Sequence, residues 1–195
     1  MEARFCDEWA HGFGWIAAAP GYMQRASHAL EADGRVWVVD PVDFDGLDDL
    51  VRGLGEPAGV LRLFSRHGRD CAAVADRLGV RLLALPAAVP GSPFETIRLS
   101  AGEVALWWPE QRVLVCAEAV GTTRYYRAGS EPVGVHPLQR LRPPAPLLML
   151  EPLHVLVGHG EGLHGSDTPA ALQQAIRHAR RRAALLPLNL LPGGR

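Results

Sequence analysis

The chain has 195 residues, of which 48% are hydrophobic and 21% are charged, and its formal net charge is -1. This length predicts one domain over residues 1–195, with a core that needs no disulfide or metal to hold it. The charge balance excludes a global basic field that would attract nucleic acid. All 20 basic residues are arginines, which excludes a Schiff-base lysine and a P-loop lysine.

The cysteines and the hydropathy pattern indicate the cellular compartment in which we expect the protein. Cys6, Cys71 and Cys116 lie far apart and form no CxxC pair. An odd number of unpaired cysteines is typical of reduced thiols, so we expect a cytoplasmic protein. No apolar run approaches about 20 residues, and the first residues carry several acids. We therefore expect no transmembrane helix, no membrane association and no signal peptide.

The first part of the chain predicts a β-meander followed by alternating strands and helices. Apolar residues at helical spacing predict a helix over 44–54, with Asp43 as its N-cap. The Asp33-Gly34 pair is a strong hairpin signal between two β-branched or apolar runs. The strands predicted here cover residues 13–18, 27–32, 36–39, 59–64 and 80–85, with a further helix over 69–78. Such alternation in the middle of the chain is typical of a parallel sheet.

The second part predicts a second group of strands and a final amphipathic helix over 168–184. The strands are expected over residues 95–99, 103–108, 112–117 and 154–157, and residues 147–150 form a short helix or strand. Residues 121–146 are rich in Pro, Gly and Arg and read as a long irregular loop, which is typical of a functional or mobile segment. Residues 185–195 read as a loose tail.

One stretch concentrates reactive side chains at the end of a predicted strand. The apolar run that ends at Phe64 is followed by Arg66, His67, Arg69 and Asp70, and the next helix starts near Cys71. In α/β folds, ligands bind at the carboxyl ends of strands. The sequence therefore predicts a functional site at this loop.

Four landmarks together resemble the metallo-β-lactamase fold superfamily. They are the meander that ends in Val-Val-Asp at 38–40, the strand, loop and helix at 63–71, the hairpin that ends at 115–119, and Val-Leu-Val-Gly-His-Gly at 155–160. The resemblance implies an αββα sandwich, in which two mixed sheets face each other and helices cover the outside. It also implies a metal site at one edge, where the loops at the strand ends meet.

The match is incomplete at the metal-binding motif. The superfamily pattern is His-x-His-x-Asp-His, and here Arg66 and Gly68 stand where two histidines are expected. Asp70 matches the aspartate, and Cys71 replaces the last histidine. A shift by one residue to use His67 restores only one imidazole. The remaining landmarks imply that Glu118 replaces a bridging aspartate, that His159 matches the last histidine ligand, and that the middle histidine is missing.

Two interpretations of this site follow. In the first, Asp70, Glu118 and His159, with Cys71 as a further ligand, hold one zinc, iron or manganese ion. In the second, the site holds no metal, because Arg66 and Arg69 would repel a dication and would pair with the carboxylates instead. Asp70 would then serve only as a helix cap, Cys71 as a buried thiol and His67 as a solvated loop residue.

Three functional hypotheses correspond to these interpretations. The leading one is a non-catalytic member of the superfamily, without the dinuclear metal site, that binds an anionic small molecule or a protein partner. Its cleft is lined by Arg66, His67, Arg69, Asp70, Glu118 and His159. The second is a hydrolase of an ester, thioester or phosphoester with a single metal ion and Asp70 as a catalytic residue. The third is a metal-free thiol enzyme that uses Cys71, with His159 or His67 as the base.

Overall fold

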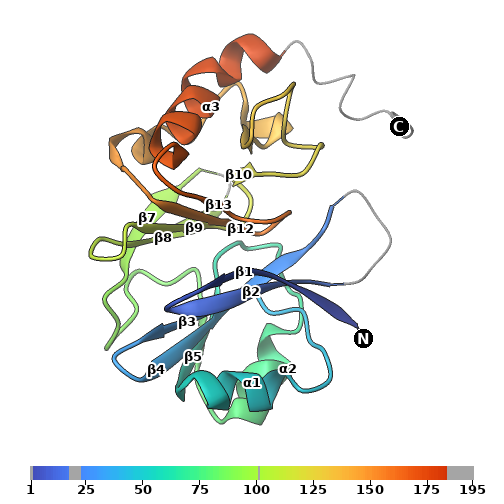
Figure 1. The fold of residues 1–195 in the computed structure, drawn as a ribbon, viewed down its shortest axis with the longest axis vertical. Helices are drawn as coiled ribbons and strands as arrows, with labels where there is room; N and C mark the ends of the chain where they lie inside the picture. Colours follow the sequence, from blue (N-terminus) through green and yellow to red (C-terminus); the bar gives the residue numbers. More distant parts are fainter. Residues whose placement is uncertain (1, 18–22, 101, 184–195) are drawn as a thin grey trace.

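The computed structural model describes residues 2–17, 23–100 and 102–183. Two mixed β-sheets face each other at the centre of the molecule, and helices cover their outer faces (Figure 1). Helices α1 (Leu47–Leu54) and α2 (Cys71–Leu78) lie on one side of this pair of sheets, and α3 (Thr168–Arg182) lies on the other. The αββα sandwich predicted from the sequence is confirmed.

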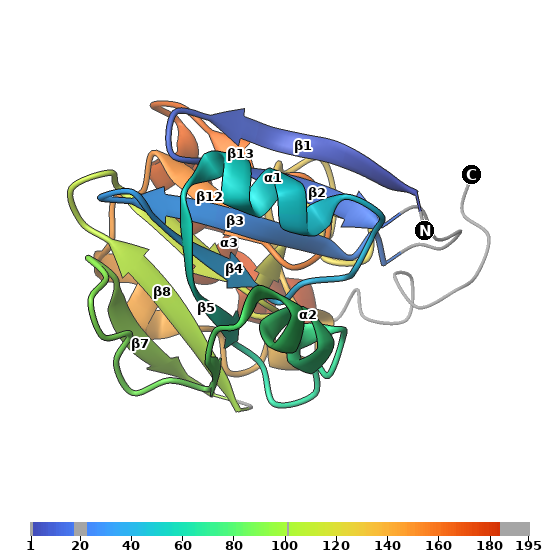
Figure 2. The same cartoon turned by 90° about the horizontal axis from the view of Figure 1, so that it is seen from below.

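The first sheet contains six strands in the order β1-β2-β3-β4-β5-β6. Its strands are β1 (Ala3–Trp9), β2 (Gly12–Ala17), β3 (Ala26–Ala32), β4 (Arg35–Val39), β5 (Glu56–Arg62) and β6 (Leu82–Ala84). The first four strands run antiparallel as a meander, and β4, β5 and β6 run parallel to one another. The parallel connections pass through α1 (Leu47–Leu54) and α2 (Cys71–Leu78), and both helices lie on the outer face (Figure 2).

The second sheet contains five strands in the order β13-β12-β9-β8-β7. The strands are β7 (Glu95–Leu99), β8 (Glu103–Trp108), β9 (Val113–Cys116), β12 (His154–Val157) and β13 (Leu163–His164). Strands β9 and β12 run parallel, so their carboxyl ends lie side by side. The chain between them forms the small β10 (Val120–Gly121) and β11 (Gly134–Val135) pair and two 3-10 helices, Pro137–Gln139 and Ala145–Met149. Helix α3 (Thr168–Arg182) covers the outer face of this sheet.

The alternation of side chains along the strands explains the four layers. In β4, Trp37 and Val39 point into the core between the sheets, whereas Val36 and Val38 pack against α1 and α2. In β9, Val115 faces the same central core, and the neighbouring Leu114 and Cys116 pack toward α3. A strand that is apolar on both faces must be covered on both sides, which explains why helices flank both sheets.

Several local features follow from the sequence, and others do not. Asp33 and Gly34 both have positive φ, at 51° and 75°, and they join β3 to β4 as the hairpin signal predicted. The predicted start of α1 was wrong, because the helix begins at Leu47 with Gly46 as its N-cap, not Asp43. Strand β1 was not predicted, because six of its seven residues are half-buried or exposed and they show no strict alternation. The ends of the strand over 13–18 and of the helix over 168–184, and the tail 185–195, lie outside the described residues.

Among the described residues, no helix is both long and apolar enough to cross a membrane.

The core between the sheets yields a prediction about stability. Leu61 is fully buried there, so Leu61→Ala leaves a cavity and should lower the free energy of unfolding by about 2–5 kcal/mol. Met149→Ala is a matched control, since its side chain is 87% exposed and truncation should change stability by less than about 0.5 kcal/mol. Urea denaturation monitored by tryptophan fluorescence measures both values. Equal losses for the two variants would contradict this assignment of the core.

Candidate metal centre

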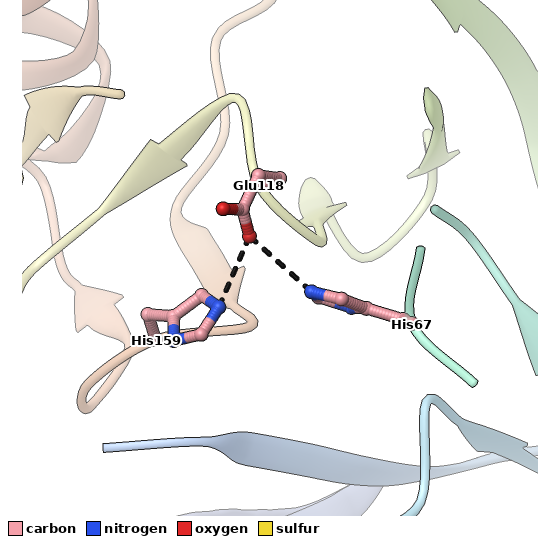
Figure 3. A group of neighbouring side chains, drawn as sticks. All are labelled: His67, Glu118 and His159. Carbon is pink, nitrogen blue, oxygen red and sulfur yellow. Dashed lines mark hydrogen bonds and ion pairs between the residues drawn. The ribbon is translucent and has the colours of Figure 1, made fainter. Parts of the chain in front are cut away.

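Three side chains from three separate loops converge at one edge of the two sheets. His67 follows β5, Glu118 lies in the turn after β9, and His159 follows β12. Figure 3 shows both imidazole rings pointing toward the Glu118 carboxylate. Their three potential ligand atoms all lie within 4.8 Å of one another. The site therefore lies where strand ends meet, as the sequence predicted, but its members differ from the predicted set.

Glu118 is the centre of this group. Its Oε2 atom lies 3.0 Å from Nε2 of His159 and 3.2 Å from Nε2 of His67, and its Oε1 atom lies 3.3 Å from Nε2 of His136. Burial alone would raise the pKa of the Glu118 carboxyl. The hydrogen bonds and charges of His159 and His67 outweigh burial and hold that pKa well below its usual range. Glu118 is therefore a carboxylate throughout the physiological pH range.

The orientation of the His67 ring is fixed by Asp40. The Asp40 side chain is 3% exposed, and its Oδ2 atom lies 3.3 Å from Nδ1 of His67. The other carboxylate oxygen, Oδ1, accepts a hydrogen bond from the backbone N–H of Leu63. A carboxylate only accepts hydrogen bonds, so Nδ1 of His67 carries the proton. In the neutral ring, Nε2 then presents its lone pair to Glu118.

His159 has the same arrangement. Its Nδ1 donates to the backbone carbonyl of Met23, so its Nε2 is the unprotonated nitrogen of the neutral ring. The ring is 4% exposed and is stacked on Tyr126, with centroids 5.7 Å apart. The neighbouring Gly158 lets the backbone before His159 approach that of Ala117, because a Cβ at Gly158 would lie 2.2 Å from the carbonyl oxygen of Ala117. The close backbone approach inferred from the flanking glycines is present.

His136 differs from the other two imidazoles. Its Nδ1 accepts a hydrogen bond from the backbone N–H of Leu138, so the neutral ring carries its proton on Nε2. Burial lowers the pKa of His136, which favours this neutral form. Nε2 of His136 lies 3.3 Å from Oε1 of Glu118, so the positive edge of this neutral ring faces the carboxylate. His136 lies in a segment with no regular pattern, and sequence reasoning did not identify it as a site residue.

These tautomers determine which groups face Oε2 of Glu118. As neutral rings, His67 and His159 would direct Nε2 lone pairs at Oε2 of Glu118, and as imidazolium rings they donate to it. Burial lowers the pKa of His67, but its hydrogen bonds to Asp40 and Glu118 outweigh burial and raise that pKa. The arrangement is favourable if both rings take up a second proton, or if a single cation accepts all three electron pairs. Two imidazoles and one carboxylate form a ligand set that zinc uses in catalytic sites and that iron uses in mononuclear sites. The donor set therefore fits one transition-metal ion.

A second buried carboxyl group holds the turn that presents Glu118. Oε1 of Glu103 accepts hydrogen bonds from the backbone N–H groups of Ala117 and Glu118, at 2.9 and 3.0 Å. Its Oε2 atom is buried and has no hydrogen-bond partner among the described residues. Burial raises the pKa of Glu103 to about 7. Glu103 thus fixes the backbone of the central ligand, a role that no motif in the sequence indicates.

The site opens into a cavity of ≈ 460 Å³. Its lining combines the imidazoles with cationic and apolar side chains, among them Arg25, Arg66, Met23, Phe64 and Leu138. Arg25 and Arg66 are both exposed, and the Arg66 guanidinium lies 5.8 Å from the centroid of the Phe64 ring. A cavity with this lining suits a ligand that carries both a negative charge and an apolar part.

The comparisons with known proteins concern the fold. No protein-family model matches the chain, and no curated protein matches it. Among solved structures, a metallo-β-lactamase from Hirschia baltica is similar at 10% identity, with a TM-score of 0.59 over 95% of this chain and 98% of that one. A metallo-β-lactamase from Pontibacter korlensis is similar at 9% identity, with a TM-score of 0.59 over 90% and 99% of the two chains. The DIM-1 metallo-β-lactamase has 14% identity and a TM-score of 0.57 over 94% and 98%.

The chain has the metallo-β-lactamase fold. The fold implied by the sequence landmarks is thus confirmed, at identities too low to transfer a site. Within this metallo-β-lactamase fold, Glu118 and His159 lie together as predicted. His67 joins them instead of remaining a solvated loop residue.

Two residues predicted as ligands lie elsewhere in this metallo-β-lactamase fold. Oδ2 of Asp70 accepts a hydrogen bond from the backbone N–H of Asp43 at 2.8 Å, so Asp70 holds the loop before α1. It is the N-cap residue of α2 but makes no side-chain capping bond. Cys71 is the first residue of α2, is 1% exposed and packs in the core between α2 and the first sheet, and burial raises the pKa of its thiol to about 12. A buried thiol of this kind is unreactive at neutral pH.

The two arginines of the predicted loop have different roles. The Arg69 guanidinium donates to the backbone carbonyls of Ala26, Asp40 and Gly158. Ala26 belongs to β3 of the first sheet, and Gly158 follows β12 of the second, so Arg69 connects the two sheets at the edge of the site. Arg66 is exposed and remains a candidate for anion binding.

This difference between the arginines predicts unequal effects on stability. Arg69→Lys cannot reach three carbonyls with one ammonium group, and each buried carbonyl left unpaired costs about 1–3 kcal/mol. We expect a loss of at least about 2 kcal/mol in the free energy of unfolding. The control, Arg66→Lys, should change it by less than about 0.5 kcal/mol. Chemical denaturation measures both, and equal stability of the two variants would refute the bridging role.

The burial of the thiols predicts their reactivity. Cys6, Cys71 and Cys116 are unpaired and buried, and burial raises the pKa of each. In the native protein, none of them should react with a thiol-specific reagent within minutes at pH 7–8, whereas three should react after denaturation. Rapid modification of Cys71 in the folded protein would restore the thiol-enzyme hypothesis.

Proposed function

We propose that the protein is a metal-dependent hydrolase that binds one transition-metal ion through His67, Glu118 and His159. The observation that supports this proposal is that Nε2 of His67 and Nε2 of His159 lie 3.2 and 3.0 Å from the same carboxylate oxygen, Oε2 of Glu118. Each ring has already committed its Nδ1 proton to another acceptor. A cation satisfies all three groups at once, whereas the metal-free site must hold two imidazolium rings close together.

The donor set and its surroundings suit catalysis. A bound ion supplies Lewis acidity, which polarises a carbonyl or phosphoryl oxygen. Asp40 keeps His67 oriented, as the carboxylate partners of metal-bound histidines do in other proteins. Nε2 of His136 lies beside Oε1 of Glu118, at 3.3 Å, which leaves Oε2 as the oxygen that faces His67 and His159.

The cavity favours an anionic substrate. Arg25 and Arg66 line its wall, and neither belongs to the ligand group. Arginine pairs bidentately with carboxylates and phosphates. We therefore propose an ester, thioester or phosphoester that carries a negative group, with Met23, Phe64 and Leu138 in contact with its apolar part.

A non-catalytic role is the second candidate. It is favoured by the sequence of the loop after β5, where Arg66 and Gly68 stand in place of two histidines. Without metal, protonated His67 and His159 together with His136 surround Glu118 and form a polar cluster whose members contact one another. The cavity would then bind an anionic small molecule without turnover.

Metal analysis of variants distinguishes these candidates. Untagged protein should carry about one equivalent of zinc, iron or manganese, and Glu118→Gln should weaken binding at least about tenfold, since even an outer-shell change costs that much. Asp70→Asn is the matched control, because an amide oxygen can still accept from Asp43 N–H. It should retain metal, whereas the ligand set inferred from sequence predicts loss. Elemental analysis and calorimetric titration give both results.

The activity arm of the same experiment uses esters, thioesters and phosphoesters with anionic groups. Metal-loaded protein should hydrolyse at least one class, and the Glu118→Gln variant should not. Protein that stays folded, binds no metal after dialysis against zinc, iron or manganese, and shows no turnover would favour the non-catalytic candidate.

A further inference from the structure

The turn that carries His159 belongs to the second sheet but is held by groups of the first. This turn covers residues 158–162, between β12 and β13. Strand β13 lies at the edge of its sheet and pairs with β12 through two residue pairs. We propose that Asp7, on β1 of the first sheet, is a positioning residue that fixes this turn and thereby the direction of the His159 ring. The inference rests on the proposed function, in which His159 is a metal ligand.

Backbone carbonyls of the segment that leads into β3 hold the first half of the turn. The backbone N–H of Gly160 donates to the carbonyl of Gln24 at 2.9 Å. The His159 ring donates from Nδ1 to the carbonyl of Met23. The ring can keep this hydrogen bond only while the backbone of the turn stays in place. The position of the second half of the turn therefore matters for His159 as well.

Asp7 holds the second half of the turn. Its Oδ1 atom accepts hydrogen bonds from the backbone N–H of Gly162 at 2.7 Å and from Nε2 of His164 at 3.0 Å. The Thr122 hydroxyl adds a bond to the carbonyl of Glu161. The Asp7 side chain is 3% exposed, and burial alone would raise the pKa of its carboxyl, but the hydrogen bond from His164 and the other polar groups around it outweigh burial and lower that pKa. Asp7 is therefore a carboxylate, and its charge strengthens both bonds.

The backbone of β1 departs from regular strand geometry at Asp7. Its φ is 55°, in the left-handed region that aspartate tolerates better than most residues with a side chain. The register of β1 against β2 shifts between Cys6 and Trp9, so this part of β1 contains one residue more than the part of β2 opposite. A bulge of this kind changes the direction of a side chain, and strained residues of this kind cluster at functional sites. Here the strained residue is the one whose carboxylate reaches the opposite sheet.

Two glycines make room for the Asp7 carboxylate. A Cβ at Gly162 would lie 2.7 Å from its Oδ1 atom, and a Cβ at Gly14, on β2, would lie 3.0 Å from its Oδ2 atom. A larger residue at position 162 must therefore displace either the carboxylate or the turn. Gly162 is three residues from His159, so a displacement on one side of the turn reaches the ring on the other side. The contact between Asp7 and Gly162 thus connects the first sheet to the candidate metal centre.

Substitution of Asp7 in the full-length protein tests the proposal with two readouts. Asp7→Asn keeps the shape of the side chain and tolerates the same φ, but it removes the charge that strengthens both bonds. It should weaken Zn²⁺ binding about tenfold, as does the loss of groups behind metal ligands in other proteins. In the metal-free protein, the Nδ1–H signal of His159 in ¹H–¹⁵N spectra should exchange with water at least about tenfold faster, because the turn opens more often. The control Arg4→Gln removes an exposed ion pair with Glu161 in the same turn and should change neither value.

The two readouts separate a failure of this inference from a failure of the proposed function. If the wild-type protein binds no Zn²⁺, the proposed function fails, and the exchange rate of the His159 Nδ1–H still decides whether Asp7 positions the ring. Gly162→Ala disturbs the same contact and should also speed this exchange, so it serves if Asp7→Asn does not fold. An unchanged exchange rate, or an unchanged Zn²⁺ affinity in protein that binds the ion, overturns the inference. Equally faster exchange of the amides in β7 and β8 would indicate a general loss of stability and would overturn it too.

Discussion

One partly buried carboxylate, that of Glu118, organises the edge of the fold where the strands end. Glu118 receives three imidazoles from three segments that lie far apart in the sequence, and its own backbone is held by Glu103. A buried carboxylate is stable only when surrounding groups compensate its charge. The loops after β5, β11 and β12 are therefore coupled through one oxygen pair. Any change in protonation or ion occupancy at Glu118 must be transmitted to all three.

A second constraint at the sheet ends is that the two sheets share no strand, so side chains must connect them there. Backbone groups at the sheet ends need partners, because water is partly excluded there. Arg69 supplies donors to carbonyls of both sheets, and Asp7 accepts from a backbone N–H and a histidine across the same gap. Polar side chains therefore join the sheets at their ends, where the apolar core between them stops.

The sequence predicted the layers well, because strands such as β4 and β9 are apolar on both faces and must be covered on both sides. The order of strands, loops and helices could also be predicted, because it depends on patterns within short stretches of the sequence. It predicted the location of the site but only part of its membership. Asp70 matches the motif by spacing, yet Arg69 has a φ of 33°, and the side chains of this loop do not follow the directions that the spacing implies. His67 therefore replaces Asp70 in the group. His136 was missed because its approach to Glu118 depends on the path of a long irregular segment, which no local pattern encodes.

The Arg69 bridge also restricts how a dinuclear metal site could be introduced into this chain by mutation. Histidines at positions 66 and 68 would restore the spacing of the motif, but the guanidinium would still lie between the sheets and would still bring a fixed charge. Replacing Arg69 first removes the partner of three carbonyls and weakens the fold before any ligand is gained. The order of substitutions thus matters, because the arginine that would repel a second metal ion also holds the two sheets together.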